Sequence, residues 1–197
     1  MKRIMLVVWL LLPAVALAYH FGPGQKQMAL DHANQLLREA DRLAQLESWN
    51  QAALRFEEAL QVLPKEDIQA RQRIRLELAK AQMLSSQLPA AHRALSDLVD
   101  ELKEEGDASS ELLGEARSAH ANSQYYMTWL MRLEGQPEEV WRPEVDSAEQ
   151  TYRLLAQQSA EQGDEAAARQ IKEDLEATIK LARMELSELQ GLPLPSQ

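Results

Sequence analysis

The apolar residues of this chain recur at spacings of three and four along almost its whole length after residue 25. This spacing places them on one side of an α-helix, and it predicts seven amphipathic helices joined by short connections. Beyond residue 18 the chain has only four Val, four Ile and three Thr residues, too few β-formers for a sandwich or barrel. Glycines stand where left-handed helix caps would end four of the segments. We therefore predict an all-α fold.

Residues 33–66 carry an ordered pattern of small and large residues over two of these predicted helices. Small residues would let two helix backbones approach each other, and a large one would fill the gap to the next pair. The segment resembles a tetratricopeptide repeat, a pair of antiparallel helices of about 34 residues. The positions that carry the resemblance are Ala40, Trp49, Ala52, Phe56, Ala59 and Pro64.

Two further units follow, one at residues 72–104 and a less regular one at 108–162. A last amphipathic helix, within residues 164–190, would cap the array. The resemblance implies about seven antiparallel helices in a short TPR-like α-solenoid, and a plain helical bundle is the alternative. The residues that correspond to the pattern of the first unit are Ala79, Ala91, Leu95, Ala121, Ala148 and Tyr152.

The first 18 residues have the three parts of a secretory signal peptide. Two basic residues precede an uninterrupted apolar run, Ile4–Leu12, and Ala16 and Ala18 fit the small-x-small cleavage rule. Cleavage would leave a protein exported to the periplasm or secreted, which suggests a bacterial host. The alternative is an uncleaved membrane anchor. The remaining parts would be a linker at 19–25, the helical domain at 26–190 and a tail at 191–197.

Composition and motifs argue against several classes of function. The 31 acidic residues outnumber 21 basic ones, giving a net charge of −10 that would be repelled by nucleic acid. The chain has no Cys, and its four His residues lack the i, i+4 spacing of a helical metal site. We also find no phosphate-binding loop or nucleophile elbow. The sequence predicts no cofactor, no metal and no catalysis.

Aromatic residues are concentrated in the third unit. Five of the nine after residue 18 fall between residues 125 and 152, around Gly135–Pro143, which we predict to be a loop inserted between two helices. Because Tyr and Trp dominate binding hot spots, an exposed contact surface is expected here, and sealing of the hairpin is the alternative. Together with the groove implied by the resemblance, the expected partner-binding residues are Tyr125, Tyr126, Trp141, Arg142, Arg73, Lys80 and Asn122.

These features favour an exported, non-catalytic scaffold that binds a protein or peptide. Two alternatives remain open. One is a structural helical subunit of a cell-envelope complex. The other is an enzyme whose site is assembled only in three dimensions.

Overall fold

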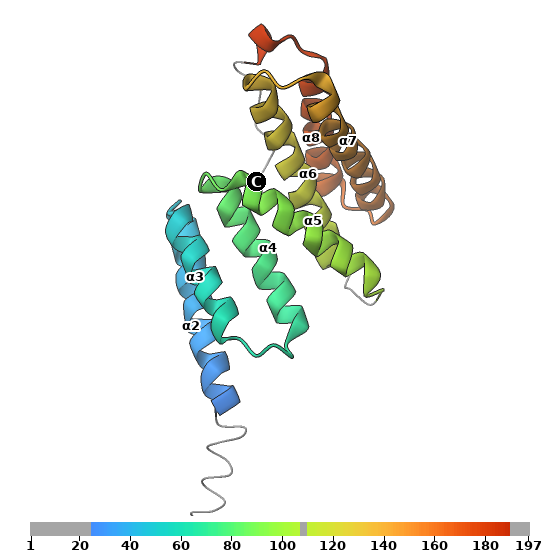
Figure 1. The fold of residues 1–197 in the computed structure, drawn as a ribbon. Coiled ribbons are helices and arrows are strands. Elements are labelled where there is room, and N and C mark those ends of the chain that lie inside the picture. The colour runs from blue at the N-terminus through green and yellow to red at the C-terminus, as the bar shows by residue number, and fades with distance from the viewer. Residues whose placement is uncertain (1–24, 107–109, 190–197) are drawn as a thin grey trace, which may run out of the picture. The chain divides into compact units, whose positions relative to one another are not determined.

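The structure, a computed structural model, describes residues 25–106 and 110–189, and every regular element in these ranges is helical (Figure 1). The prediction of an all-α fold with about seven antiparallel helices is confirmed. The chain divides into two compact units, residues 1–74 and 75–197. The helices are α2 (Gln25–Gln45), α3 (Trp49–Val62), α4 (Ile68–Leu84), α5 (Leu88–Glu104), α6 (Ser110–Leu133), α7 (Glu138–Glu161), α8 (Glu165–Arg183) and the short 3-10 helix η2 (Leu186–Glu188).

The first unit is built on the pairing of α2 with α3. Ala33, Ala40 and Ala52 are at most 1% exposed, so their small side chains allow the two helices to pack closely. Phe56 of α3 is buried as well. The pairing of small residues with one large aromatic is the arrangement that the first repeat unit predicted.

Arg71, in the first turn of α4, holds the start of this helix against the end of α3. Its guanidinium donates hydrogen bonds to the backbone oxygens of Leu60 and Leu63, at 2.8 and 3.3 Å. The last carbonyls of a helix have no partner within it, and a cation is favoured there. This contact therefore fixes the α3–α4 connection.

The second unit begins with a core between the end of α4, α5 and the first half of α6. Leu95, Leu98 and Leu102 form the apolar side of α5 and are at most 1% exposed. They pack with Leu76 of α4 and with Ala116 of α6. Repetition at three and four residues places all of them on one face, as the sequence predicted.

The second half of α6 packs against α7 and α8. Ala121 of α6 meets Ala148 and Tyr152 of α7 in one buried cluster. One turn further along α6, Tyr125 is buried with Leu181 of α8. From α5 to α8, consecutive helices thus pack against each other, which is consistent with a short helical solenoid.

The residues expected to pack the repeats are buried with two exceptions. Trp49 and Pro64 are only partly buried. The other ten have between 0 and 4% of their surface exposed, and they are Ala40, Ala52, Phe56, Ala59, Ala79, Ala91, Leu95, Ala121, Ala148 and Tyr152.

The predicted loop Gly135–Pro143 is not a loop. Only residues 134–137 connect α6 to α7, because α6 ends at Leu133 and α7 begins at Glu138 and continues through Pro143. Pro lacks the backbone N–H that the helix interior uses, but this position lies just after the first turn and on the exposed side. Two acidic residues in the first turn, Glu138 and Glu139, suit the positive end of the helix dipole.

Three of the glycines predicted to cap helices have positive φ, with values of 62, 72 and 77° at Gly106, Gly135 and Gly163. Gly191, Ala16 and Ala18 lie outside the described residues, as do the predicted signal peptide and the tail. Over the parts of the chain that the structure describes, no helix combines the length and apolar character that a membrane span requires.

Candidate functional site

The aromatic residues expected to form a contact surface are largely inside the second unit. Tyr125 has 0% of its surface exposed and packs with Ala177, Leu181 and Leu189. Burial, followed by the proximity of Tyr126, raises the pKa of its hydroxyl to about 12. Tyr126 is half-buried and meets the Tyr125 ring edge-on, with 5.7 Å between ring centroids. The expectation that Tyr125 presents an exposed contact is therefore wrong.

Trp141 is also buried, and two arginines contact its ring. The guanidinium carbons of Arg132 and Arg142 lie 4.7 and 4.8 Å from the ring centroid. Arg132 also donates hydrogen bonds to the backbone oxygens of Leu181 and Met184, at the end of α8. Trp141 and both arginines thus join α6, α7 and α8, instead of lining an exposed loop as expected.

The remaining predicted contact residues are dispersed. Arg73 is an exposed residue of the first unit. In the second unit, the Lys80 ammonium lies 2.9 Å from Glu77 and 3.6 Å from Glu115. Asn122 of α6 is buried. The second unit therefore does not gather its own predicted residues, Lys80, Asn122, Tyr125, Tyr126, Trp141 and Arg142, on one open surface.

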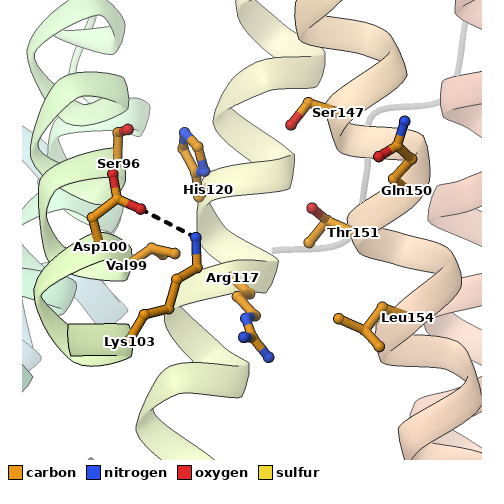
Figure 2. A pocket seen from close by; sticks show the side chains of 10 residues that line it. All are labelled: Ser96, Val99, Asp100, Lys103, Arg117, His120, Ser147, Gln150, Thr151 and Leu154. Atoms are coloured by element: carbon orange, nitrogen blue, oxygen red, sulfur yellow. Dashed lines mark hydrogen bonds and ion pairs between the residues drawn. The ribbon is translucent and has the colours of Figure 1, made fainter. Parts of the chain in front are cut away.

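The structure instead forms a pocket between α5, α6 and α7, which we call the α5–α7 pocket (Figure 2). Its volume is about 400 Å³, within the usual range for ligand sites. Most of its side chains can form hydrogen bonds. They are Ser96, Val99, Asp100 and Lys103 of α5, Arg117 and His120 of α6, and Ser147, Gln150, Thr151 and Leu154 of α7.

The two ends of the α5–α7 pocket differ in chemistry. Figure 2 shows Arg117 and His120 pointing towards opposite ends from α6. Leu154 lies at the Arg117 end, and Ser96 and Ser147 lie at the His120 end. The Lys103 ammonium reaches the middle of the pocket, where it pairs with Asp100. One end is therefore cationic with an aliphatic neighbour, and the other offers an imidazole and hydroxyl groups.

The positive charges that line the α5–α7 pocket are only partly neutralised. Lys103 pairs with Asp100 at 3.1 Å, and both side chains are about half exposed or more. Arg117 forms no ion pair with any residue that the structure describes. Two carboxylates close in sequence to Asp100 and Arg117 pair with residues of α4. Glu101 pairs with Arg75, and Glu115 pairs with Lys80.

Next to the His120 end lies a cluster of polar side chains from all three helices. The rings of His92 and His120 stack with 5.2 Å between centroids. The Ser123 hydroxyl lies 3.0 Å from Nδ1 of His92 and 2.7 Å from the backbone oxygen of His120. On α7, Glu144 lies 3.6 Å from Nε2 of His92 and accepts a hydrogen bond from Gln124 at 3.1 Å.

These contacts show which ring nitrogen of His92 carries a proton. The hydroxyl of Ser123 has a single hydrogen, and it donates this to the His120 carbonyl. Its oxygen can then only accept from His92, so Nδ1 of His92 carries a proton. When Nε2 is protonated as well, His92 of α5 forms an ion pair with Glu144 of α7.

The two titratable neighbours of His92, Glu144 and His120, both have lowered pKa values, for different reasons. The contact with His92 is the main cause that lowers the pKa of Glu144 and favours the carboxylate. Burial, and then the charge of His92, lowers the pKa of His120 from 6.5 to about 4. At neutral pH the wall of the α5–α7 pocket thus presents a neutral imidazole, with one donor and one acceptor nitrogen.

Glu144, His92 and Ser123 form an acid–imidazole–hydroxyl chain of the kind that activates a serine nucleophile. Ser123, however, has 0% of its surface exposed, and its hydrogen is directed to its own helix. In this arrangement a substrate cannot reach the oxygen. The chain instead connects α5, α6 and α7 beside the α5–α7 pocket.

Sequence reasoning missed this pocket because its residues carry no distinctive local signal. Ser147, Thr151 and Leu154 recur at helical spacing along α7, but so do the polar residues of any exposed helix face. Within residues 25–106 and 110–189, no group of three or more His, Asp or Glu side chains is arranged to hold a metal ion. No known protein family, curated protein or solved structure matches this chain.

Proposed function

We propose that the chain is an exported, non-catalytic scaffold that binds a segment of a partner protein in the α5–α7 pocket. The observation that carries this proposal is the pocket itself, in which three helices converge on one hollow lined by donors, acceptors and cations. Export rests on the basic, apolar and small-residue parts of the first 18 residues.

The length of the pocket and its hydrogen-bonding groups support a peptide segment as the ligand. The wall from Ser96 to Lys103 and the wall from Ser147 to Leu154 each span eight residues, or about 10 Å of helix between the first and the last. Serine and threonine hydroxyls both donate and accept, as do the N–H and C=O groups of a peptide backbone. About three residues of extended chain would fit this length.

Site-specific photo-crosslinking in the native host tests the proposal. A photoreactive amino acid at Gln150, an exposed residue of the α5–α7 pocket, is expected to crosslink one partner at a defined segment. The matched control carries the same group at Gln170, an exposed position of α8 outside the pocket. Mass spectrometry of the crosslinked peptides identifies the segment.

A Gln150→Trp variant supplies the second part of this test. The indole would fill the α5–α7 pocket from an exposed position, so folding should be preserved. We expect it to abolish capture of that segment by a crosslinker placed at the neighbouring Thr151. Capture at Gln170 as efficient as at Gln150, or capture unaffected by Gln150→Trp, would contradict the proposal.

A further inference from the structure

The charge at one end of the α5–α7 pocket is opposite to that of the chain as a whole. The pocket as a whole contains two cations, Lys103 and Arg117, and one carboxylate, Asp100, in a protein whose net charge is −10. The guanidinium of Arg117 lies at one end (Figure 2). Asp100 lies against Lys103, which leaves Arg117 without an ion pair among the described residues. A guanidinium binds a carboxylate with two parallel hydrogen bonds, so an acidic side chain is its complement.

An aliphatic side chain would fit beside that carboxylate. Leu154 is 42% exposed at the same end of the pocket, opposite Lys103 in Figure 2. Val99 also lines the pocket and is itself buried. A ligand side chain placed against Leu154 would remove apolar surface from water, at about 25 cal/mol for each Å².

The opposite end supplies neutral hydrogen-bonding groups. The lowered pKa of His120 favours its neutral form at neutral pH. Ser96 and Ser147 lie at the same end of the pocket (Figure 2). These groups can satisfy backbone amides of a bound segment without selecting a charge. Asp100 and Lys103, which also act on His120, pair with each other, so Arg117 supplies the charge of the pocket that has no ion pair among the described residues.

We infer that the α5–α7 pocket selects an extended segment in which an Asp or Glu lies within two residues of a Leu, Ile or Val. The acidic group would bind Arg117, and the aliphatic one would contact Leu154. This inference rests on the proposed function, and it adds the class of partner that the same site recognises.

Selection of phage-displayed random peptides on the full chain tests the inference. Peptides that bind wild type but not Gln150→Trp define the set bound in the pocket. We expect this set to be enriched in an acidic residue next to an aliphatic one. Affinities of synthetic peptides are then measured for Arg117→Gln, for the conservative Arg117→Lys, and for Arg169→Gln as a control at an exposed position of α8.

We expect Arg117→Gln to weaken peptide binding about tenfold or more. Arg117→Lys should weaken it less, because lysine can still donate a charged hydrogen bond and glutamine cannot. Arg169→Gln should bind as wild type does, and added salt should weaken wild-type binding. Pocket-dependent peptides without a carboxylate, or equal binding by Arg117→Gln, would overturn the inference and leave the proposed function standing. A selection that yields no peptide sensitive to Gln150→Trp would contradict both.

Discussion

The guanidinium of Arg132 lies over the ring of Trp141, 4.7 Å from its centroid, while the same group donates to the carbonyls at the end of α8. One side chain of α6 is thus bound to α7 through the indole and to α8 through the backbone. The relationship explains why Trp141, which lies within a segment that contains Gly and Pro, is buried.

Arg132→Ala should reduce the free energy of unfolding by about 2–4 kcal/mol. It removes charged hydrogen bonds, each contributing ~1.5–3 kcal/mol, and a cation–π contact of ~0.5–2 kcal/mol. Urea unfolding followed by circular dichroism measures this loss. Arg142→Ala is the comparison, since its contact with the Ala182 carbonyl is longer, at 3.5 Å, and its carboxylate partner Glu138 is exposed. An equal loss in both variants would contradict a specific role for Arg132.

Tyr125→Ala should destabilise the protein by about 3–5 kcal/mol, the usual range for removing a buried aromatic ring. Tyr125 is completely buried against α8, so the loss should appear as a lower melting temperature. Tyr126→Ala, at the half-buried neighbour, should cost less. If Tyr125→Ala melts at the wild-type temperature, the packing described for α6 and α8 is incorrect.

Ala52→Asp should cost several kcal/mol, of the order expected for an unpaired charge placed in a packed interior. Ala52 has 0% of its surface exposed where α3 packs on α2. Leu54→Asp serves as the matched control, because Leu54 lies two residues away on the same helix and is 57% exposed. Similar unfolding free energies for the two variants would rule out the α2–α3 pairing.

Stability should fall as the pH is lowered from about 6.5 to 4, and His120 should account for part of this fall. Its pKa is lowered to about 4 in the folded protein, so over this interval the unfolded chain binds a proton that the folded chain does not. The contribution is on the order of 2–3 kcal/mol, fully present above pH 6.5 and lost as the pH approaches 4.

The measurement for His120 is urea unfolding at several pH values between 4.5 and 7.5 for wild type and His120→Gln. The variant should show a shallower dependence on pH over this interval. His32→Gln, at an exposed position of α2, should keep the wild-type slope. Parallel curves for wild type and His120→Gln would contradict the burial of a neutral imidazole.

Much of the helical structure could be predicted from the sequence because its signals are local. Leu95 and Leu98 lie on the same face because they are three residues apart in a helix, and both are buried. Gly163 ends a helix because glycine readily adopts the positive φ that is found there. The buried alanines at residues 40 and 52 were predictable for a similar reason, since close helix packing tolerates only small side chains. These features need no knowledge of what lies across the interface.

The start of α7 was predicted wrongly because two residues within the segment favour a break in the helix, whereas a contact with another helix stabilises it. Gly135 and Pro143 both favour a break in a helix, and they do so by their own backbone geometry. Trp141, however, is held in the first turns of α7 by Arg132 and Arg142. A stabilising contact from another helix cannot be read from the residues around it.

The α5–α7 pocket and the polar cluster beside it are properties of the tertiary structure alone. His92, Ser123 and Glu144 are far apart along the chain, and each is an ordinary polar residue of an amphipathic helix. The ion pairs of Arg75 with Glu101 and of Lys80 with Glu115 likewise join α4 to α5 and to α6, between residues far apart in the sequence. The sequence by itself determined that the chain forms amphipathic helices and which residues they bury, because those choices depend on neighbours within one or two turns. Only packing between helices decided which polar groups meet, because charge and hydrogen bonding depend on distances that local periodicity does not set.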